Sequence, residues 1–424
     1  MNIFIFGTVK DSPDEQSFSR IRNDKMQKPN FTIPDEFRDQ VHCVNAKDNR
    51  SDEEIKNALS SYNPIISEKN VWAFWHSGFH SMPAWCQRNV INWVRLCGPS
   101  WTVRILDSVT TSENYALRYL PKDMLPESFV AGAMDGPYIG PHSADFLRGA
   151  CLFLHGGVFM DVGIILIRDL DRICWKQLED PGSPFQVSTP WMYGITISNS
   201  FVASRKGDPF IKRWHELFVH LWKGKKNSSG LIENPLVSFG QELSFDDSRM
   251  SKFYWDFKVE TRVVMEYITQ VLAWMRLCMI EDSGDGFNCT RYWQSNVLLF
   301  DSLEEIWGAE GTIGFPNAGQ KMFDLLSVKL DADPESEDYQ TAHKLVWRLL
   351  TKSSMQKITH GKGLTNSVHL GVLWDENEGK DCEPGTFAEL LRHGTVHLQQ
   401  NRESIVYEKA PEVTKTLKKG LLVP

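Results

Sequence analysis

Two adjacent glycines, Gly156–Gly157, separate an amphipathic segment from a short apolar one and limit how this part of the chain can fold. Residues 143–155 carry apolar side chains at helical spacing and predict a helix. Residues 158–160 are apolar and are followed by Asp161, as a buried strand ending in a carboxylate would be. Glycine permits the tight turn between the two. The pattern therefore predicts a helix folded back on a strand whose carboxyl end presents an acid.

The alternation of helices and strands continues on both sides of this segment. Strands are predicted at residues 71–75 and 101–106, and helices at residues 81–98 and 208–224. Ser81 and Asp208 are the expected N-caps, and the strand at 101–106 delivers Asp107. This order predicts an α/β fold with a mostly parallel sheet flanked by helices. Ligands of such sheets bind at the carboxyl ends of the strands, where Asp107 and Asp161 are expected.

The predicted domain organisation is one α/β domain with an extension at each end. Residues 8–66 are polar with weak periodicity, and residues 1–66 are interpreted as a variable N-terminal extension. Residues 67–395 form the domain itself, and residues 396–424 form a C-terminal tail. Within its last third, a strand at 368–374 and a helix at 386–392 are predicted to pack on the same core.

Charge, cysteine content and hydropathy restrict the compartment and the partners. The formal net charge of −8 argues against a surface coated for nucleic acid. The eight cysteines are scattered, without a CxxC pair, which favours reduced thiols. The chain contains neither an apolar run of about 20 residues nor a typical signal peptide, so we expect a cytoplasmic protein without a membrane anchor.

The residues with the clearest chemical potential lie in the segment around the glycine pair. Asp145 and Arg148 are three residues apart on one face of the predicted helix, where they can pair or face a ligand together. Together with the glycine pair and Asp161, they resemble the "SDxxRxxxLxxxGGxYxDxD" pattern of GT-A glycosyltransferases in the capsular-polysaccharide-synthesis and related families. The resemblance covers roughly residues 70–220 and implies a GT-A-like fold. It also implies that Asp145 and Arg148 organise a nucleotide-sugar donor.

In that family the final D-x-D is implied to hold a divalent metal, Mg²⁺ or Mn²⁺, against the donor diphosphate. Here the motif reads Asp161-Val162-Gly163, and glycine offers no side-chain oxygen to a hard cation. Whether a metal binds therefore stays open, and Lys, Arg or a helix N-terminus would have to stabilise the leaving diphosphate instead. A literal D-x-D follows at Asp169 and Asp171, which suits the active site and a helix N-terminus equally well.

A second resemblance leads to a different substrate. Residues 136–175 are similar to fungal arginine-containing cyclodipeptide synthases, cytosolic tRNA-dependent enzymes thought to derive from glycosyltransferases. This implies condensation of arginine from arginyl-tRNA with a second aminoacyl-tRNA, giving a cyclo(Arg-Xaa) diketopiperazine. The candidate residues are Asp161, Asp169 and Asp171 for catalysis, and Asp145, Arg148 and Asp107 for substrate binding.

Three functions are thus weighed. The leading hypothesis is the cyclodipeptide synthase, against which the net acidity of the chain counts. The alternative is a cytosolic glycosyltransferase that uses a nucleoside-diphosphate sugar with a degenerate D-x-D motif. The third is a catalytically silent binding protein on the same scaffold.

Two further motifs receive structural interpretations. His142 and Ser143 would suit a base and a nucleophile, but adjacent helical residues diverge, and Ser143 is more simply the N-cap. Residues 360–363, His-Gly-Lys-Gly, have the composition of a phosphate-binding loop but predict a turn.

Overall fold

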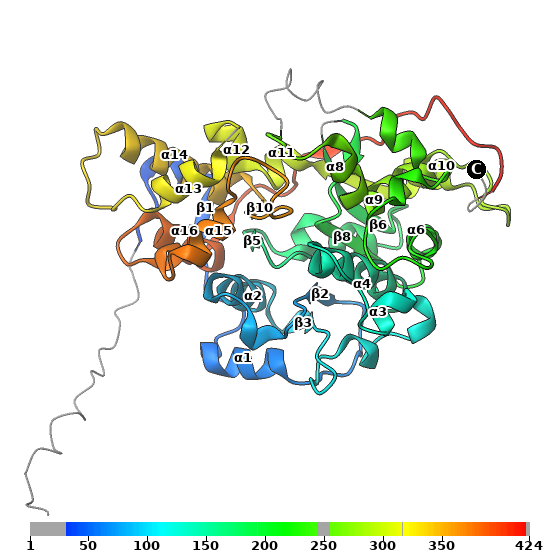
Figure 1. Cartoon of the computed structure of the whole chain (residues 1–424). Helices are drawn as coiled ribbons and strands as arrows, with labels where there is room; N and C mark the ends of the chain where they lie inside the picture. The colour runs from blue at the N-terminus through cyan, green and yellow to red at the C-terminus, as the bar shows by residue number, and fades with distance from the viewer. Residues whose placement is uncertain (1–30, 193, 244–254, 316, 421–424) are drawn as a thin grey trace, which may run out of the picture. The chain divides into compact units, whose positions relative to one another are not determined.

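The computed structural model describes residues 31–192, 194–243, 255–315 and 317–420. The chain divides into two units, Met1–Ile33 and Pro34–Pro424. The elements described below all belong to the second unit (Figure 1).

The centre of this unit is an eight-stranded mixed sheet with the order β12-β9-β6-β8-β4-β2-β3, in which β7 also pairs with β6. The strands are β2 (Asn70–Phe74), β3 (Thr102–Leu106), β4 (Gly157–Met160), β6 (Val187–Met192), β7 (Thr196–Ile197), β8 (Phe201–Ser204), β9 (Val297–Asp301) and β12 (Tyr407–Glu408).

Most strands of this sheet run in one direction. The pairs β2–β3, β2–β4 and β6–β9 are parallel. Strand β8 is antiparallel to both β4 and β6, and the edge strand β12 is antiparallel to β9. The α/β fold predicted from the sequence is therefore confirmed, with β8 as a reversed strand inside the sheet.

Helices pack against the sheet as the alternating pattern predicts. Helix α4 (Ile139–His155) packs on β2, β4 and β8, and α6 (Pro209–Leu221) packs on α4 and on α9 (Thr269–Cys278). Helix α2 (Ala84–Cys97) packs on β3 and on β5 (Ile164–Leu166). The core between these layers is rich in rings, including the fully buried Trp72, Phe146, Phe159, Trp214 and Trp274. Large aromatic side chains supply much of the apolar area that stabilises such a core.

The predicted helix boundaries hold in part. Asp208 caps α6 by accepting hydrogen bonds from the backbone of Phe210 and Ile211, and Gly98 ends α2. The prediction of Ser81 as the cap of α2 is wrong, because Ser81 ends a separate 3-10 turn, Phe79–Ser81, before Pro83. Ser143 is also not a cap, since α4 begins at Ile139 and Ser143 lies buried within it.

Gly157 must be glycine because two strands meet closely there. Its φ is +105°, and a Cβ atom would lie 2.2 Å from the carbonyl oxygen of Asn70 on β2. A side chain would therefore push β4 away from β2. This contact sets the position of β4, and with it the position of Asp161.

The rest of the chain adds a helical layer and two short sheets. The helices are α1 (Asp52–Ser60), α3 (Glu127–Val130), α5 (Lys176–Glu179), α8 (Thr261–Tyr267), α10 (Cys289–Asn296), α11 (Ser302–Glu305), α12 (Gly308–Ile313), α13 (Ala318–Leu326), α14 (Glu337–Lys352), α15 (Leu370–Glu376) and α16 (Phe387–His397). Strand β1 (Val41–Cys43) pairs with β11 (Leu398–Gln400), and β10 (Met355–Lys357) pairs with β5. From Pro34 on, the described parts of the predicted extensions thus belong to the same unit as the domain (Figure 1).

The prediction for the C-terminal third is half right. The helix predicted at 386–392 exists as α16, capped by Thr386, and continues to His397. The strand predicted at 368–374 is wrong, because this apolar run forms α15. Leu370 and Trp374, four residues apart, are buried on one side of that helix.

All eight cysteines lie among the described residues and carry free thiols. Within the described ranges, every helix is too short or too polar to cross a lipid bilayer.

Candidate functional site

An open cavity of about 550 Å³ lies at the carboxyl ends of β2 and β4. Trp75 and His76 follow β2, Asp161 follows β4, and all three line this cavity. The start of α4 forms another wall, which includes Asp145 and Arg148. The topology therefore brings together the helix residues and the strand acid singled out in the sequence. We call this space the polar cleft.

Arg148 is the centre of the hydrogen-bond network in the polar cleft. Its side chain is 2% exposed and forms an ion pair with Asp145, as the spacing of the two residues predicts. It also donates to Oε1 of Gln270 at 2.7 Å and to Oδ1 of Asp161 at 2.9 Å. Asn199 donates to the same Asp145 oxygen at 3.1 Å and to Gln270 at 2.9 Å. These contacts fix the guanidinium, because several acceptors hold its planar face in one orientation.

Asp161 has a partner on each carboxylate oxygen. Oδ1 accepts from Arg148, and Oδ2 accepts from Nζ of Lys357 at 2.7 Å. Burial alone would raise the pKa of Asp161, but the charges of Lys357 and Arg148 outweigh it and hold the pKa below its ordinary value. The side chain is 29% exposed and is ionised at neutral pH.

A second cavity of about 190 Å³ adjoins the polar cleft. Both cavities are lined by Asp161, Asn199, Tyr267, Ile268, Lys357 and His360. Beyond these shared residues the lining of the second cavity is mainly aliphatic, aromatic and thioether: Met192, Ile195, Ile197, Leu243, Trp255, Phe257, Val264, Met265, Val271, Leu272, Met275 and Leu364. We call it the apolar cavity. It suits a hydrophobic small molecule that presents one polar group toward Asp161.

The other three predicted site residues lie elsewhere. Asp107 follows β3 as expected, but its carboxylate accepts from Val109 and Ser112 and stabilises its own loop. Burial raises the pKa of Asp107, and this residue lines neither cavity.

The literal D-x-D motif also lies outside both cavities. Asp169 accepts from the backbone of Arg172, and Asp171 accepts from Nζ of Lys69 at 2.9 Å. In the chain, strand β5 lies between Asp161 and these two acids. The two acids are at the start of the helical turn Asp171–Trp175. Of the two interpretations left open by the sequence, the geometry matches the helix N-terminus.

Several residues of the site carried no local signal in the sequence. Lys357 is 196 positions from Asp161, and Gln270 and Asn199 are single amides that belong to no recognisable motif. The prediction of a turn at 360–363 is confirmed, but His360 also lines both cavities. His142 lies buried within α4, among the rings of Tyr138, Trp222 and Tyr267.

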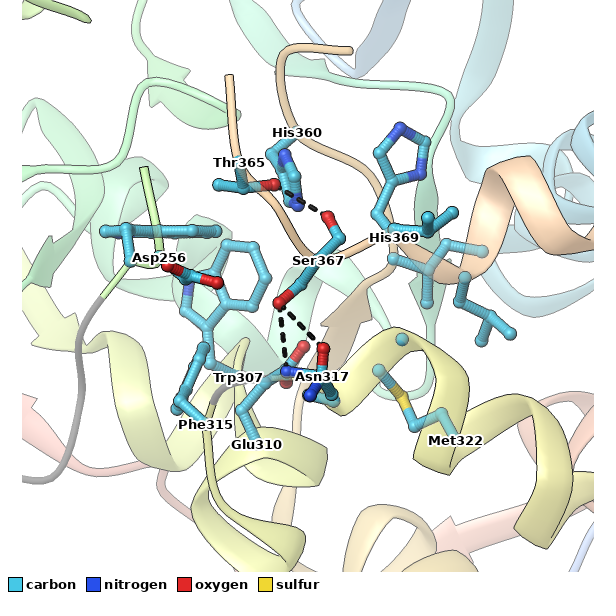
Figure 2. A pocket seen from close by; sticks show the side chains of 16 residues that line it. Asp256, Trp307, Glu310, Phe315, Asn317, Met322, His360, Thr365, Ser367 and His369 are labelled. Carbon is cyan, nitrogen blue, oxygen red and sulfur yellow. Dashed lines mark hydrogen bonds between the residues drawn. The ribbon is translucent and has the colours of Figure 1, made fainter. Parts of the chain in front are cut away.

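A smaller cavity of about 40 Å³ shares Trp255, Trp307, His360 and Thr365 with the apolar cavity and contains a buried acid, Glu310 (Figure 2). There Glu310 accepts a hydrogen bond from Nε2 of Gln356 at 2.8 Å, and the same nitrogen donates to the carbonyl oxygen of Lys357. Burial raises the pKa of Glu310 to about 8, although the hydrogen bond from Gln356 acts in the opposite direction. At neutral pH this side chain is therefore mostly protonated.

Because of the raised pKa of Glu310, we expect the protein to lose stability as the pH rises, and we expect Glu310→Gln to remove this loss. Below the ordinary value of 4.5 the carboxyl group is neutral in both the folded and unfolded states. Between 4.5 and about 8 only the unfolded chain ionises, so the free energy of unfolding falls as the pH rises. The difference between wild type and variant should change by on the order of 4 kcal/mol from pH 4 to pH 9. Urea unfolding across this range measures it.

The control for this prediction is Glu216→Gln, which changes a half-exposed glutamate of α6. We expect its stability to follow that of the wild type across the pH range. A Glu310→Gln profile that also runs parallel to the wild type would contradict the raised pKa.

Comparison with known proteins identifies similar chains along nearly the whole length. "Probable glycosyltransferase FCK3" of Fusarium pseudograminearum is 52% identical over 392 residues, covering 92% of this chain and 99% of that protein. "O-glycosyltransferase braB" of Annulohypoxylon truncatum is 37% identical, covering 89% of this chain and 91% of that protein. "Glycosyltransferase afumC" of Aspergillus fumigatus is 36% identical, covering 87% and 94%.

Two cavities meet at one carboxylate on the carboxyl edge of an α/β sheet, where ligands of such sheets bind. Residues 12–231 match the family described as "Capsular polysaccharide synthesis protein". The chain therefore belongs to this family, and it is a transferase. The resemblance to this family stated from the sequence is confirmed. The resemblance to cyclodipeptide synthases receives no support, since the similar proteins are named glycosyltransferases.

Proposed function

We propose that the protein transfers a sugar from a nucleoside-diphosphate donor to a hydroxyl group of an apolar small molecule. The observation that carries this proposal is the position of Asp161 and its cationic partners at the junction of the polar cleft and the apolar cavity. A donor in the first space and an acceptor in the second would meet at that point. The three similar proteins are all named glycosyltransferases, and one of them is named an O-glycosyltransferase, which agrees with transfer of a sugar to a hydroxyl group.

The polar cleft is suited to the charged donor. Arg148 and Lys357 present positive charge to it, and the first turn of α4 borders it at Ile139 and Gly140. The N-cap residue is Tyr138, and its side chain makes no hydrogen bond to the backbone of this turn. A helix N-terminus with free N–H groups favours an anion, so it can add to the attraction of a diphosphate.

The apolar cavity is suited to the acceptor. Its lining would bury an aliphatic or aromatic skeleton, and the polar residues that it shares with the cleft would orient the reacting hydroxyl group. In the transfer, the bond between the anomeric carbon and the β-phosphate oxygen breaks, and its electron pair stays on the diphosphate. A bond from the acceptor oxygen to the anomeric carbon forms, and the hydroxyl proton is released.

The test is turnover by the purified protein. It is incubated with a panel of nucleoside-diphosphate sugars, with and without a panel of apolar alcohols, and release of nucleoside diphosphate is followed. We expect one donor to be consumed, and one alcohol to raise the rate above donor hydrolysis and to gain the mass of a sugar. Failure to consume any donor would contradict the proposal. An arginine-containing diketopiperazine in extracts of expressing cells would favour the cyclodipeptide synthase instead.

A single surface substitution tests the role of the apolar cavity. Ile195 lines it and is 46% exposed, so Ile195→Asp should fold normally but weaken binding of an apolar acceptor. Losing the contact of one aliphatic side chain and adding a charge should raise the acceptor KM by about tenfold or more, with little change in the donor KM. The matched control is Ile66→Asp, which changes an 88% exposed isoleucine outside both cavities. Equal acceptor KM values for the two variants would place the acceptor elsewhere.

A further inference from the structure

Position 163 cannot hold the second acid of a D-x-D motif unless the side chain of Thr359 moves. A Cβ atom at Gly163 would lie 1.9 Å from Oγ1 of Thr359, and 2.8 Å from its methyl group. Contacts this short do not occur between real side chains, so an aspartate there would require Thr359 to move. Gly163 therefore not only lacks a metal-binding side chain but also leaves space that the side chain of Thr359 occupies.

The pairing of β10 with β5 places that side chain. Lys357 lies opposite Ile164 in the antiparallel register, and the backbone N–H of Ile358 donates to the carbonyl oxygen of Gly163 at 2.9 Å. This register carries Thr359 over Gly163. It also directs the ammonium group of Lys357 to Asp161, 2.7 Å from Oδ2.

A divalent cation does not fit the oxygens that remain. Mg²⁺ and Mn²⁺ prefer about six oxygen ligands, and Asp161 already gives one oxygen to Arg148 and the other to Lys357. Asp145 likewise binds Arg148 and Asn199. Throughout the described part of the chain, no three His, Cys, Asp or Glu side chains are arranged to hold a metal ion. A cation beside Asp161 would also be repelled by the ammonium group.

The exchange conserves charge. Two carboxylates with one divalent cation are neutral together, and so are the single carboxylate of Asp161 and the ammonium of Lys357. The replacement therefore leaves the local electrostatic balance intact while removing the requirement for a metal. Lys357 lines both cavities and is 10% exposed, so its charge is only partly screened by water.

We infer that Lys357 takes the place of the divalent metal of the D-x-D motif, so that the enzyme binds the donor diphosphate without a metal ion. This inference rests on the proposed function. When the bond to the anomeric carbon breaks, negative charge grows on the β-phosphate oxygen. Lys357 and Arg148 are the fixed charges that stabilise this oxygen, and Asp161 positions both of them.

The experiment is calorimetric titration of the whole protein with UDP, GDP, ADP and dTDP, once in EDTA and once in MnCl₂. At least one nucleoside diphosphate should bind in EDTA, with a Kd within about twofold of that in manganese. Lys357→Met keeps the aliphatic stem and removes the charge, so it should weaken this binding by about tenfold to a hundredfold. Lys357→Arg should recover part of the loss. The control is Lys69→Met, whose ammonium group pairs with Asp171 outside the cleft.

The outcomes separate the two proposals. Binding that requires manganese overturns the inference about Lys357 and leaves the glycosyltransferase proposal standing. Binding that Lys357→Met does not weaken, or weakens no more than Lys69→Met does, also overturns the inference. Absence of binding by every nucleoside diphosphate in both buffers overturns the proposed function and the inference with it. The comparison of the two buffers uses wild-type protein, so it decides whether a metal is required even if the variants do not fold.

Discussion

Asp161→Asn is expected to reduce sugar transfer, measured as kcat/KM, by about 10²- to 10³-fold. The amide keeps one acceptor oxygen, so its NH₂ group must face either Arg148 or Lys357, and both of these are donors. One of the two cations then loses its partner and its position against the leaving diphosphate. The loss should persist when manganese is added, because in the inferred site Lys357 takes the place of the metal. The variant should still give a native circular dichroism spectrum, since Asp161 is partly exposed.

The matched control is Asp171→Asn, in the literal D-x-D motif. Asp171 bonds to Lys69 and lies outside both cavities, so its kcat/KM should stay close to that of the wild type. The pair of variants therefore asks which of the two acid motifs serves the reaction. A large loss in Asp171→Asn, with little change in Asp161→Asn, would reverse the assignment made here from the geometry.

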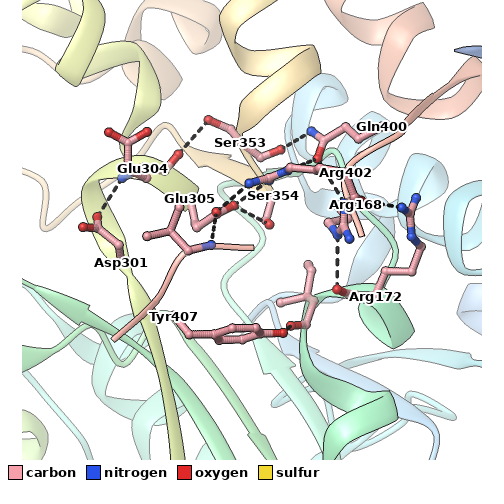
Figure 3. Close-up of polar contacts among 12 residues, drawn as sticks. Arg168, Arg172, Asp301, Glu304, Glu305, Ser353, Ser354, Gln400, Arg402 and Tyr407 are labelled. Carbon is pink, nitrogen blue, oxygen red and sulfur yellow. Dashed lines mark hydrogen bonds and ion pairs between the residues drawn. The ribbon is translucent and has the colours of Figure 1, made fainter. Parts of the chain in front are cut away.

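Glu305→Ala is expected to lower the free energy of unfolding by about 3–5 kcal/mol. Glu305, at the end of α11, is fully buried and forms a two-point ion pair with Arg402 at 2.8 Å on each oxygen (Figure 3). Its carboxylate also accepts from Oγ of Ser354 at 2.6 Å and from the backbone of Val406 at 2.9 Å. Removing it leaves the donors of Ser354 and Val406 without their acceptor, and the partly exposed Arg402 without its counter-charge.

The consequence is local as well as global. Arg402 and Val406 belong to the segment that leads to β12, so this segment should become an early site of proteolytic cleavage in Glu305→Ala. The control is Glu304→Ala, one residue earlier, whose 50% exposed carboxylate pairs with Arg348. A half-exposed pair contributes about 1 kcal/mol or less. Equal urea midpoints for the two variants would show that the buried network does not stabilise the fold.

The parts of the fold that the sequence predicted are those encoded by neighbouring residues. The helix α4, the glycine pair and β4 follow one another within about twenty positions, and their periodicity and turn chemistry identify them. The cap of α6 at Asp208 is similarly local. Errors arose where local signals were ambiguous: the apolar run at 368–374 is short enough to suit a strand or a helix, and tertiary packing selects the helix.

In the candidate site as well, the residues that could be predicted are those close to one another in the sequence. Asp145, Arg148 and Asp161 could be predicted, because a helix–turn–strand unit brings them together without help from the rest of the chain. Asp169 was an equally good candidate by sequence, and only the path of β5 separates it from the cleft. Lys357 and Thr359 could not be predicted, since their role depends on the register between two strands that are far apart in the chain.

The sequence alone therefore determined the α/β scaffold, its family and one carboxylate at the end of a strand, because short-range periodicity and steric rules fix these features. The tertiary structure decided the chemistry around that carboxylate. It placed an ammonium group on Asp161 and a threonine over Gly163, and it opened an apolar cavity next to the charged cleft. These relations depend on contacts between segments that are distant in the chain. Bringing such segments together has an entropic cost, which the packing of the whole domain offsets. A local sequence pattern therefore cannot predict them.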